Sequence, residues 1–307
     1  MPNFNQILEE HGRLVAEGTP NALDVQRRSY LRRVSELTGR NTIAYYSGWL
    51  TKPPGQQNID ICDDDKNGFM ATIYGLDRKK GLDLMMHTPG GDIAATESLV
   101  NYLRKMFGID IRVIVPQIAM SAGTMIACAA KQIIMGKHSN LGPIDPQVNG
   151  VAAAGVLDEF SDAVNAVKSD PAAASIWQAI IGKYHPTFLG SCQRAINMSR
   201  QIVTEWLRTG MFDGDPDAVA KAKAIVEAFS DHQATKSHAR HIHMEECQRL
   251  GMKVQELESD PVLQEAILSV HHAAMFTLTA TPSFKFIENQ NGQAYFRILQ
   301  APPPANA

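Results

Sequence analysis

The sequence has few cysteines and no long apolar run. Its four cysteines show no CxxC spacing, which argues against a disulfide framework and against a four-cysteine zinc site. No segment holds eighteen uninterrupted apolar residues, and the polar stretch from Met1 to Glu10 lacks the apolar core of a signal peptide. We therefore expect a reduced, cytoplasmic location and no membrane anchor. The cysteines are Cys62, Cys128, Cys192 and Cys247.

Charge of one sign is not in excess either. The 307 residues include 29 basic and 32 acidic side chains, a net charge of -3. This balance favours neither nucleic acid nor an acidic membrane, so we expect no nucleic-acid partner. No phosphate-binding GxxxxGK[ST] motif occurs, so any unfolding of substrate would need a separate ATPase partner.

The sequence also lacks a complete set of metal-binding residues. Histidines gather between His232 and His243, and Cys247 follows them. Neither a carboxylate nor a second cysteine completes a zinc-binding set at these spacings. We expect no metal and no other cofactor.

What the chain does contain is an alternation of apolar strands and helices. The runs Leu82–Met86, Ile111–Val115 and Gln132–Met135 predict buried strands, and helical patterns over 93–107 and 122–130 separate them. Such an alternation predicts an α/β fold with a parallel sheet. Binding and catalytic sites of these sheets lie at the carboxyl ends of the strands.

The remaining periodic segments frame this core. A turn rich in Asp is expected to precede one of the helices, and Asn291-Gly292 predicts a type I′ turn in a terminal hairpin. The other expected elements are helices over 4–16, 22–37, 69–76 and 262–276, a strand over 42–46, hairpin strands over 284–287 and 294–299, and a nearly all-helical stretch over 151–229.

These segments suggest a division of the chain into parts. The Pro-rich composition of the last seven residues predicts a disordered tail. The parts are N-terminal helices over 1–38, a catalytic domain over 39–255 with a helical insertion over 151–230, a C-terminal helix and hairpin over 256–300, and the tail over 301–307.

Two turns of small residues follow two neighbouring strands. Gly90 and Gly91 can present backbone N–H groups where other residues would be strained. Ser121 precedes a helical run, so its hydroxyl would lie near the N–H of Ala122, which has no partner inside the helix. A nucleophile beside fixed donors is what acyl transfer requires. Taken singly, each motif is also compatible with an ordinary turn or helix start.

The motifs, taken in order, resemble those of one family. His87-Thr88-Pro89-Gly90-Gly91-Asp92, Met120-Ser121-Ala122-Gly123-Thr124 and Leu141-Gly142-Pro143-Ile144-Asp145-Pro146-Gln147 resemble the serine dehydrogenase proteinase family. This family lies within the Clp protease and crotonase superfamily, which also holds signal peptide peptidase A. The likeness runs from about Arg32 to Val254 and, more weakly, to the hairpin near Asn291. It implies a core of ββα repeats with additional helices and a C-terminal hairpin, serine protease activity and a homo-oligomer.

A serine needs a base to become a nucleophile. In the Clp protease subunits that this chain resembles, a histidine follows the serine by about twenty-five residues and an aspartate comes later. Here Asp145 stands at the first place and His238 near the second, so the resemblance implies exchanged roles. Ser121 would attack, His238 would act as general base, and Asp145 would orient the imidazole. Alternatively, Asp145 caps a turn and His238 is a surface residue.

A lysine is the second candidate base. Signal peptide peptidase A uses a serine and lysine dyad, in which burial lowers the pKa of the amine. Lys183 lies in the helical region where that lysine would be expected, and Lys137 is closer to the motifs in sequence. His87 is expected to shape its loop, with a direct catalytic role as the weaker alternative.

The expected function is that of a serine hydrolase, a peptidase that cleaves extended peptides through an acyl-enzyme on Ser121. Gly91 and Ala122 would hold the oxyanion, helped by Gly90. One alternative is a crotonase-type enzyme that stabilises the enolate of an acyl-CoA thioester and has no need of Ser121. Another is a catalytically silent scaffold, and fold alone does not choose among the three.

Overall fold

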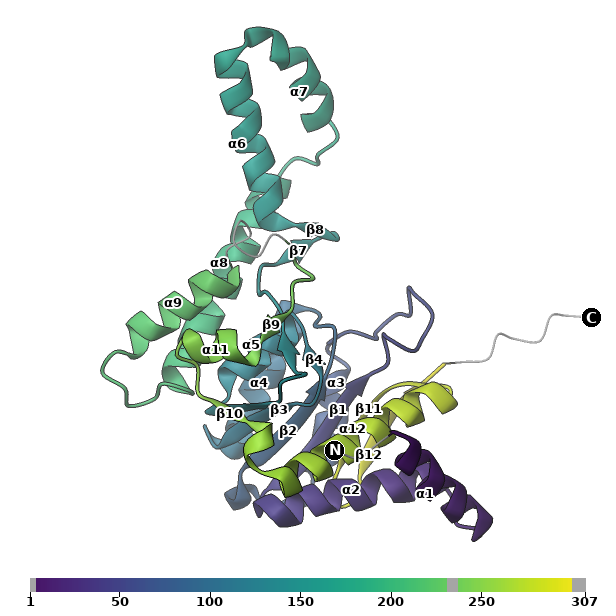
Figure 1. Ribbon diagram of the computed structural model, residues 1–307. Coiled ribbons are helices and arrows are strands. Elements are labelled where there is room, and N and C mark those ends of the chain that lie inside the picture. Colours follow the sequence, from purple (N-terminus) through teal and green to yellow (C-terminus); the bar gives the residue numbers. More distant parts are fainter. Residues whose placement is uncertain (1–3, 231–236, 300–307) are drawn as a thin grey trace, which may run out of the picture.

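The structure is a computed structural model that describes residues 4–230 and 237–299 (Figure 1). Its centre is a sheet in which seven strands of the described part follow the order β10-β5-β3-β2-β1-β11-β12. Neighbours from β10 to β1 run parallel, whereas β11 pairs antiparallel with β1 and with β12. The predicted α/β class is therefore confirmed. The strands are β1 (Asn41–Ser47), β2 (Leu82–His87), β3 (Ile111–Val115), β5 (Gln132–Met135), β10 (Val254–Glu256), β11 (Ser283–Asn289) and β12 (Ala294–Ile298).

Helices cover both faces of this sheet. Every residue of β2 is buried, as expected for a strand with a covered surface on each side. Leu84 and Met86 belong to the core of one side and Met85 to that of the other, because side chains alternate along a strand. The first side is covered by α4 (Ile93–Phe107) and α5 (Ala122–Ala129), the second by α2 (Ala22–Thr38) and α12 (Pro261–Ala280), with α1 (Phe4–Ala16) against them.

Part of the mostly helical stretch over 151–230 forms an arm (Figure 1). In Figure 1, α6 and α7 project away from the sheet, and α8 leads back to the body. The second half of α8 is buried in the main core through Val203, Trp206 and Leu207, whereas α7 buries none of its residues. The elements are β7 (Gln147–Val148), β8 (Val151–Ala152), α6 (Ala153–Ser169), η2 (Pro171–Ala173), α7 (Ala174–Ile181), α8 (Phe188–Thr209) and α9 (Ala218–Ser230). Among the described residues, no helix combines the length and apolar character needed to cross a bilayer.

A second, small sheet joins parts of the chain that are distant in sequence. It consists of β4 (Ile118–Ala119), β6 (Asn140–Leu141) and β9 (Ile242–His243). β6 pairs parallel with β4 and antiparallel with β9. After β9 the chain continues into α11 (Met244–Arg249) and then into β10. The segment that follows β6 and the segment that precedes β9 therefore leave this sheet at the same end.

The helix expected over 69–76 begins and ends earlier, as α3 (Asp65–Ile73). The carboxylate of Asp65 is buried and accepts the backbone N–H of Cys62 at 3.0 Å, which starts the helix at this residue. Tyr74 adopts an extended conformation and Gly75 a positive φ of 78°, and these two residues end it. Short 3-10 turns, η1 (Arg78–Lys80) and η3 (Leu257–Ser259), complete the described elements.

The prediction of a type I′ turn in the terminal hairpin is wrong. A type I′ turn needs positive φ at both central residues, but here Gly292 has a φ of 83° and Asn291 is not among the residues with positive φ. The N–H of Gly292 instead donates to the carbonyl of Asn289 at 3.0 Å, and that of Asn289 to the carbonyl of Gln293 at 3.0 Å. This is the three-residue loop in which a left-handed glycine follows an ordinary turn.

Candidate active site

The structure brings four predicted site residues to one cavity. Ser121, Gly90, Gly91 and His238 line a cavity of about 630 Å³, located where β2 ends and α5 begins. Asp145 lies behind His238 with only 2% of its side chain exposed. The carboxyl-terminal edge of the parallel strands is thus where these residues meet, as expected for such a sheet.

Ser121 occupies a strained turn between a strand and a helix. Its φ is 50° and its ψ is -114°, a conformation that residues with a side chain rarely adopt. The turn is held because the N–H of Met120 donates to the carbonyl of Thr88 at 3.0 Å and that of Gly123 to the carbonyl of Met120 at 2.7 Å. A serine on a sharp strand-to-helix turn presents its hydroxyl at the top of the sheet. Ser121 is partly buried, and its backbone has the conformation of a sharp turn between a strand and a helix.

The glycine loop is held against residue 61. The N–H of Ile61 donates to the carbonyl of Gly90 at 2.7 Å, and the N–H of Asp92 donates to the carbonyl of Ile61 at 2.9 Å. Successive groups of an extended chain point to opposite sides, so the N–H of Gly91 points away from Ile61. Within residues 4–230 and 237–299, neither this N–H nor that of Ala122 donates to another protein group. The two are therefore available for an oxyanion.

Gly90 differs from Gly91 in what it offers. Its N–H already donates to the hydroxyl oxygen of Thr88 at 3.2 Å, so it is not a second free donor beside Gly91. Its φ of 101° is unfavourable for a side chain, and a Cβ atom here would lie 2.6 Å from the Cβ of Ser121. Gly90 thus serves the site by leaving room for the serine.

His238 and Asp145 form a hydrogen-bonded pair. The distance between His238 Nδ1 and Asp145 Oδ1 is 2.9 Å. The register of the small sheet explains the pairing: Leu141 faces Ile242, Asp145 lies four residues after the former, and His238 lies four residues before the latter. Two segments that leave an antiparallel ladder together stay opposite each other.

The pair has a defined chemical polarity. An ionised carboxylate only accepts hydrogen bonds, so the proton between the two groups resides on Nδ1 of His238. Nε2 then carries the lone pair that can accept a proton. The loop that carries Asp145 is fixed through its neighbour Ile144, whose N–H donates to Phe229 at 2.9 Å and whose carbonyl accepts the Ser199 hydroxyl at 2.8 Å.

The structure does not bring the two candidate lysines to this cavity. Lys183 is exposed in the turn after α7 and does not line the cavity. Lys137 exposes 68% of its side chain, and its ammonium lies 3.6 Å from a carboxylate oxygen of Glu256. Both amines are exposed and lie outside the cavity, so neither is placed to take a proton from Ser121.

His87 lies on the other face of the sheet. It is fully buried, and its ring centroid is 4.3 Å from that of Trp49 and 5.5 Å from that of His271 on α12. Neither ring nitrogen of His87 has a hydrogen-bond partner among the described residues. Burial lowers its pKa from 6.5 to about 3, and the pKa of His271 is lowered by burial and then by the neighbouring imidazoles. His87 is therefore a neutral, buried side chain away from the cavity, and its expected role in shaping the loop stays a prediction.

Replacing His87 by phenylalanine is expected to make folding less sensitive to acid. In the unfolded chain, His87 has the ordinary pKa near 6.5. Below that pH the unfolded state therefore binds one more proton than the folded state, and the free energy of unfolding decreases as the pH is lowered. One such imidazole costs about 2 kcal/mol between pH 6.5 and 4.5. Urea unfolding of both proteins at both pH values measures the difference. An equal loss of stability in the two proteins would show that the buried, neutral His87 does not cause the acid sensitivity, since His271 remains in both.

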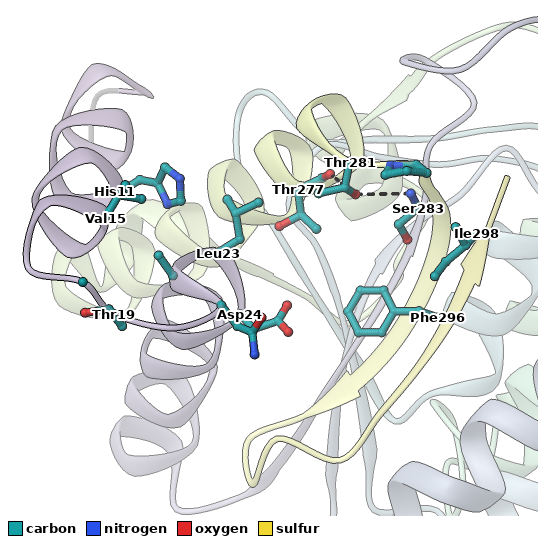
Figure 2. A pocket seen from close by; sticks show the side chains of 14 residues that line it. His11, Val15, Thr19, Leu23, Asp24, Thr277, Thr281, Ser283, Phe296 and Ile298 are labelled. Carbon is teal, nitrogen blue, oxygen red and sulfur yellow. Dashed lines mark hydrogen bonds between the residues drawn. The ribbon is translucent and has the colours of Figure 1, made fainter. Parts of the chain in front are cut away.

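A second cavity, of about 740 Å³, lies between α1, α2 and the terminal hairpin (Figure 2). Three of the hydroxyl groups that line it donate hydrogen bonds to backbone carbonyls. Thr277 donates to the carbonyl of Ala273 at 2.8 Å, Thr281 to that of Thr277 at 2.7 Å, and Ser283 to that of Arg297 at 3.3 Å. None of these hydroxyls is paired with a base, so this cavity lacks the arrangement found around Ser121.

The motifs did not reveal every residue that builds the site. Ile61, which holds the glycine loop, comes from an irregular segment without periodicity, and no signal in the sequence marks it. The apolar wall formed by Met125 and Met198 was also missed, because methionines at helical spacing indicate only a packed helix. No group of three potential metal ligands occurs in the part of the chain that the structure describes, and His232 lies outside that part.

Comparison with known proteins identifies a matching family and two similar proteins. A family model described as ClpP-like SDH-type serine proteinase matches residues 21–267. Two uncharacterized proteins of Methanocaldococcus jannaschii are similar as well: one is 31% identical over 63% of this chain and 60% of its own length, the other 28% identical over 64% and 62%. The chain thus spans about three fifths of the length of these relatives.

Proposed function

Because the chain belongs to the family of ClpP-like SDH-type serine proteinases, we propose that it is a serine peptidase with Ser121 as its nucleophile. The observation that carries this proposal is the 2.9 Å contact between His238 and Asp145 beside the cavity that Ser121 lines. A nucleophile, a base and a carboxylate that orients the base are the elements of hydrolytic triads, whatever their order in the chain.

Acylation follows from this arrangement. The hydroxyl oxygen of Ser121 attacks the carbonyl carbon of the peptide while its proton passes to Nε2 of His238. Asp145 balances the charge that then develops on the imidazole, through the proton that Nδ1 donates. The oxygen of the tetrahedral intermediate lies between the N–H groups of Gly91 and Ala122. When the intermediate collapses, His238 returns the proton to the leaving amine and the acyl-enzyme remains.

Deacylation repeats the same steps with water. His238 takes a proton from the water molecule, the hydroxide attacks the ester carbon, and the same two N–H groups receive the oxyanion. The proton then returns to the oxygen of Ser121. Free enzyme and a carboxylic acid product result, and no metal or cofactor takes part in the proposed scheme.

The cavity supports a preference for peptides with an apolar side chain near the cleaved bond. Its wall includes Ile93, Met125 and Met198 from three different helices, and Ile144 from the loop between β6 and β7. An apolar wall with a few fixed polar groups is the usual composition of a binding pocket. We propose an extended peptide as the substrate, bound along the glycine loop so that its carbonyl reaches Ser121.

The two alternative functions make less use of the observed geometry. A thioester enolate needs the N–H groups of Gly91 and Ala122 but not a histidine paired with a carboxylate. A silent scaffold needs neither the two N–H groups nor the histidine paired with a carboxylate. The pair at His238 and Asp145 and the strained backbone of Ser121 therefore favour hydrolysis.

Labelling with a fluorophosphonate probe, followed by intact-mass analysis, tests the proposal. The wild-type protein is expected to gain one probe adduct and Ser121→Ala none, because the probe bonds to an activated serine oxygen. Lys183→Ala should be labelled like the wild type, since Lys183 is exposed and outside the cavity. A folded wild-type protein without an adduct would contradict the proposal, and a Ser121→Ala protein that still processed a thioester would favour the crotonase alternative.

A further inference from the structure

The segment Ile59–Cys62 lies against the loop that carries the oxyanion donor. Its Ile61 makes the two hydrogen bonds described above, at 2.7 Å to Gly90 and at 2.9 Å from Asp92. The two backbone segments are closely packed, since a Cβ atom on Gly91 would lie 2.3 Å from both the nitrogen and the oxygen of Ile61. We call Ile59–Cys62 the supporting segment. Any displacement of it moves Gly91.

The supporting segment is fastened by buried side chains from elsewhere in the fold. Lys285, in the middle of β11, donates from its ammonium to the carbonyl of Asp60 at 2.6 Å and to the carboxylate oxygens of Asp65 at 2.8 and 3.1 Å. Asp65 in turn accepts the N–H of Cys62 at 3.0 Å. The hydroxyl of Ser47 donates to the carbonyl of Ile59. Three of the four residues of the segment, Ile59, Asp60 and Cys62, are therefore held by side chains from outside it.

Burial makes the lysine contact strong and specific. Lys285 and Asp65 each expose 2% of their side chains, and the hydroxyl of Tyr45 completes the group with a 2.9 Å hydrogen bond to Asp65. Hydrogen bonds from a charged donor are the strongest in proteins, and they are least screened where water is excluded. An ammonium in this position therefore fixes the carbonyl of Asp60 in one direction.

We propose that Lys285 is a positioning residue for the oxyanion site. It acts through Asp60 and Asp65 on the supporting segment, and through Ile61 on the N–H of Gly91. This inference rests on the proposed peptidase function. Residue 285 lies outside residues 21–267, which the family model matches, so the terminal hairpin contributes to the site from beyond the matched region. Displacements near 1 Å in such groups change reaction rates about 100-fold.

The proposal distinguishes positioning from stability. A buried ion pair that only stabilised the fold would change the fraction of folded protein, and the folded molecules would react as before. A positioning role changes the rate at which folded protein reacts. It leaves binding of the probe and the pH midpoint of labelling unchanged, because His238 is not touched.

The experiment measures fluorophosphonate labelling of folded Lys285→Met at several probe concentrations. The rate constant at saturating probe is expected to fall about 10- to 100-fold, with less than about a 3-fold change in the half-saturating concentration. Ser47→Ala removes a milder contact of the same segment and should slow labelling less. It also keeps the test valid if Lys285→Met does not fold.

The chain offers a matched control on the same strand. Arg27 forms a buried ion pair with Glu288, also in β11, but it has no contact with the supporting segment. Arg27→Met is therefore expected to lower stability and to leave the saturating rate constant of the folded protein unchanged. A wild-type rate in folded Lys285→Met would overturn the inference, and so would an equal loss in Arg27→Met. If Lys285→Met does not fold, a wild-type rate in Ser47→Ala would overturn it.

Hydrogen exchange provides a readout that does not depend on activity. The amide of Asp92, which donates to Ile61, should exchange faster in Lys285→Met than in the wild type, and at the wild-type rate in Arg27→Met. A wild-type protein without labelling would refute the peptidase function. Unchanged exchange at Asp92 in Lys285→Met would refute the coupling to Lys285 itself.

Discussion

Replacing His238 by alanine is expected to slow labelling of Ser121 and peptide hydrolysis by about 1,000-fold or more. The hydroxyl of Ser121 is a weak nucleophile at neutral pH, and among the described residues that line this cavity no other side chain is an imidazole. The N–H groups of Gly91 and Ala122 remain in the variant, so residual activity above that of water is expected. Single-turnover labelling at saturating probe measures the loss separately from binding.

Asp145→Asn tests the second member of the pair with little change in shape. Asparagine keeps the size of the side chain, but its amide can donate to Nδ1 and so favours the imidazole tautomer in which Nε2 carries the proton. A loss of about 100- to 10,000-fold is expected from this reversal alone. Labelling of Asp145→Asn at the wild-type rate would instead indicate that Asp145 only caps its turn.

Gly91→Ala is also expected to cause a large loss, about 100- to 1,000-fold in the rate constant for acylation. The new Cβ would lie 2.3 Å from the nitrogen and from the oxygen of Ile61. These are backbone atoms, so no change of side-chain rotamer can relieve the clash. The backbone at Gly91 also has a φ of 155°, at which a side chain is strained. The loop must therefore move, and the N–H of Gly91 moves with it.

The same change is expected to lower the free energy of unfolding by about 1–3 kcal/mol, as other overpacked sites do. Gly12→Ala is the matched control, since a Cβ atom there meets nothing within 4 Å and Gly12 lies inside helix α1. It should raise stability slightly, through helix propensity, and leave labelling unchanged. A Gly91→Ala protein that acylates at the wild-type rate would show that its N–H is not an oxyanion donor.

Much of the fold could be predicted because it is encoded locally. The helix over 93–107 and the strands over 111–115 and 132–135 have the bounds that periodicity predicts. The start of α3 could not be predicted in this way, because Asp65 begins the helix through contacts with Cys62 and Lys285. The hairpin loop differs for a related reason. A single left-handed glycine satisfies it, and the dipeptide Asn291-Gly292 alone does not distinguish that loop from a type I′ turn.

By itself, the sequence indicated the layered α/β core, the glycine loop and the turn at Ser121, because each is marked by residues adjacent in the chain. Only the tertiary structure decided which residues meet these motifs. His238 reaches Asp145 across 93 positions through strands of two residues, which are too short to show a period. Lys285 reaches Asp60 across 225 positions. Contacts of this kind depend on sheet order and register, which no local pattern of residues specifies.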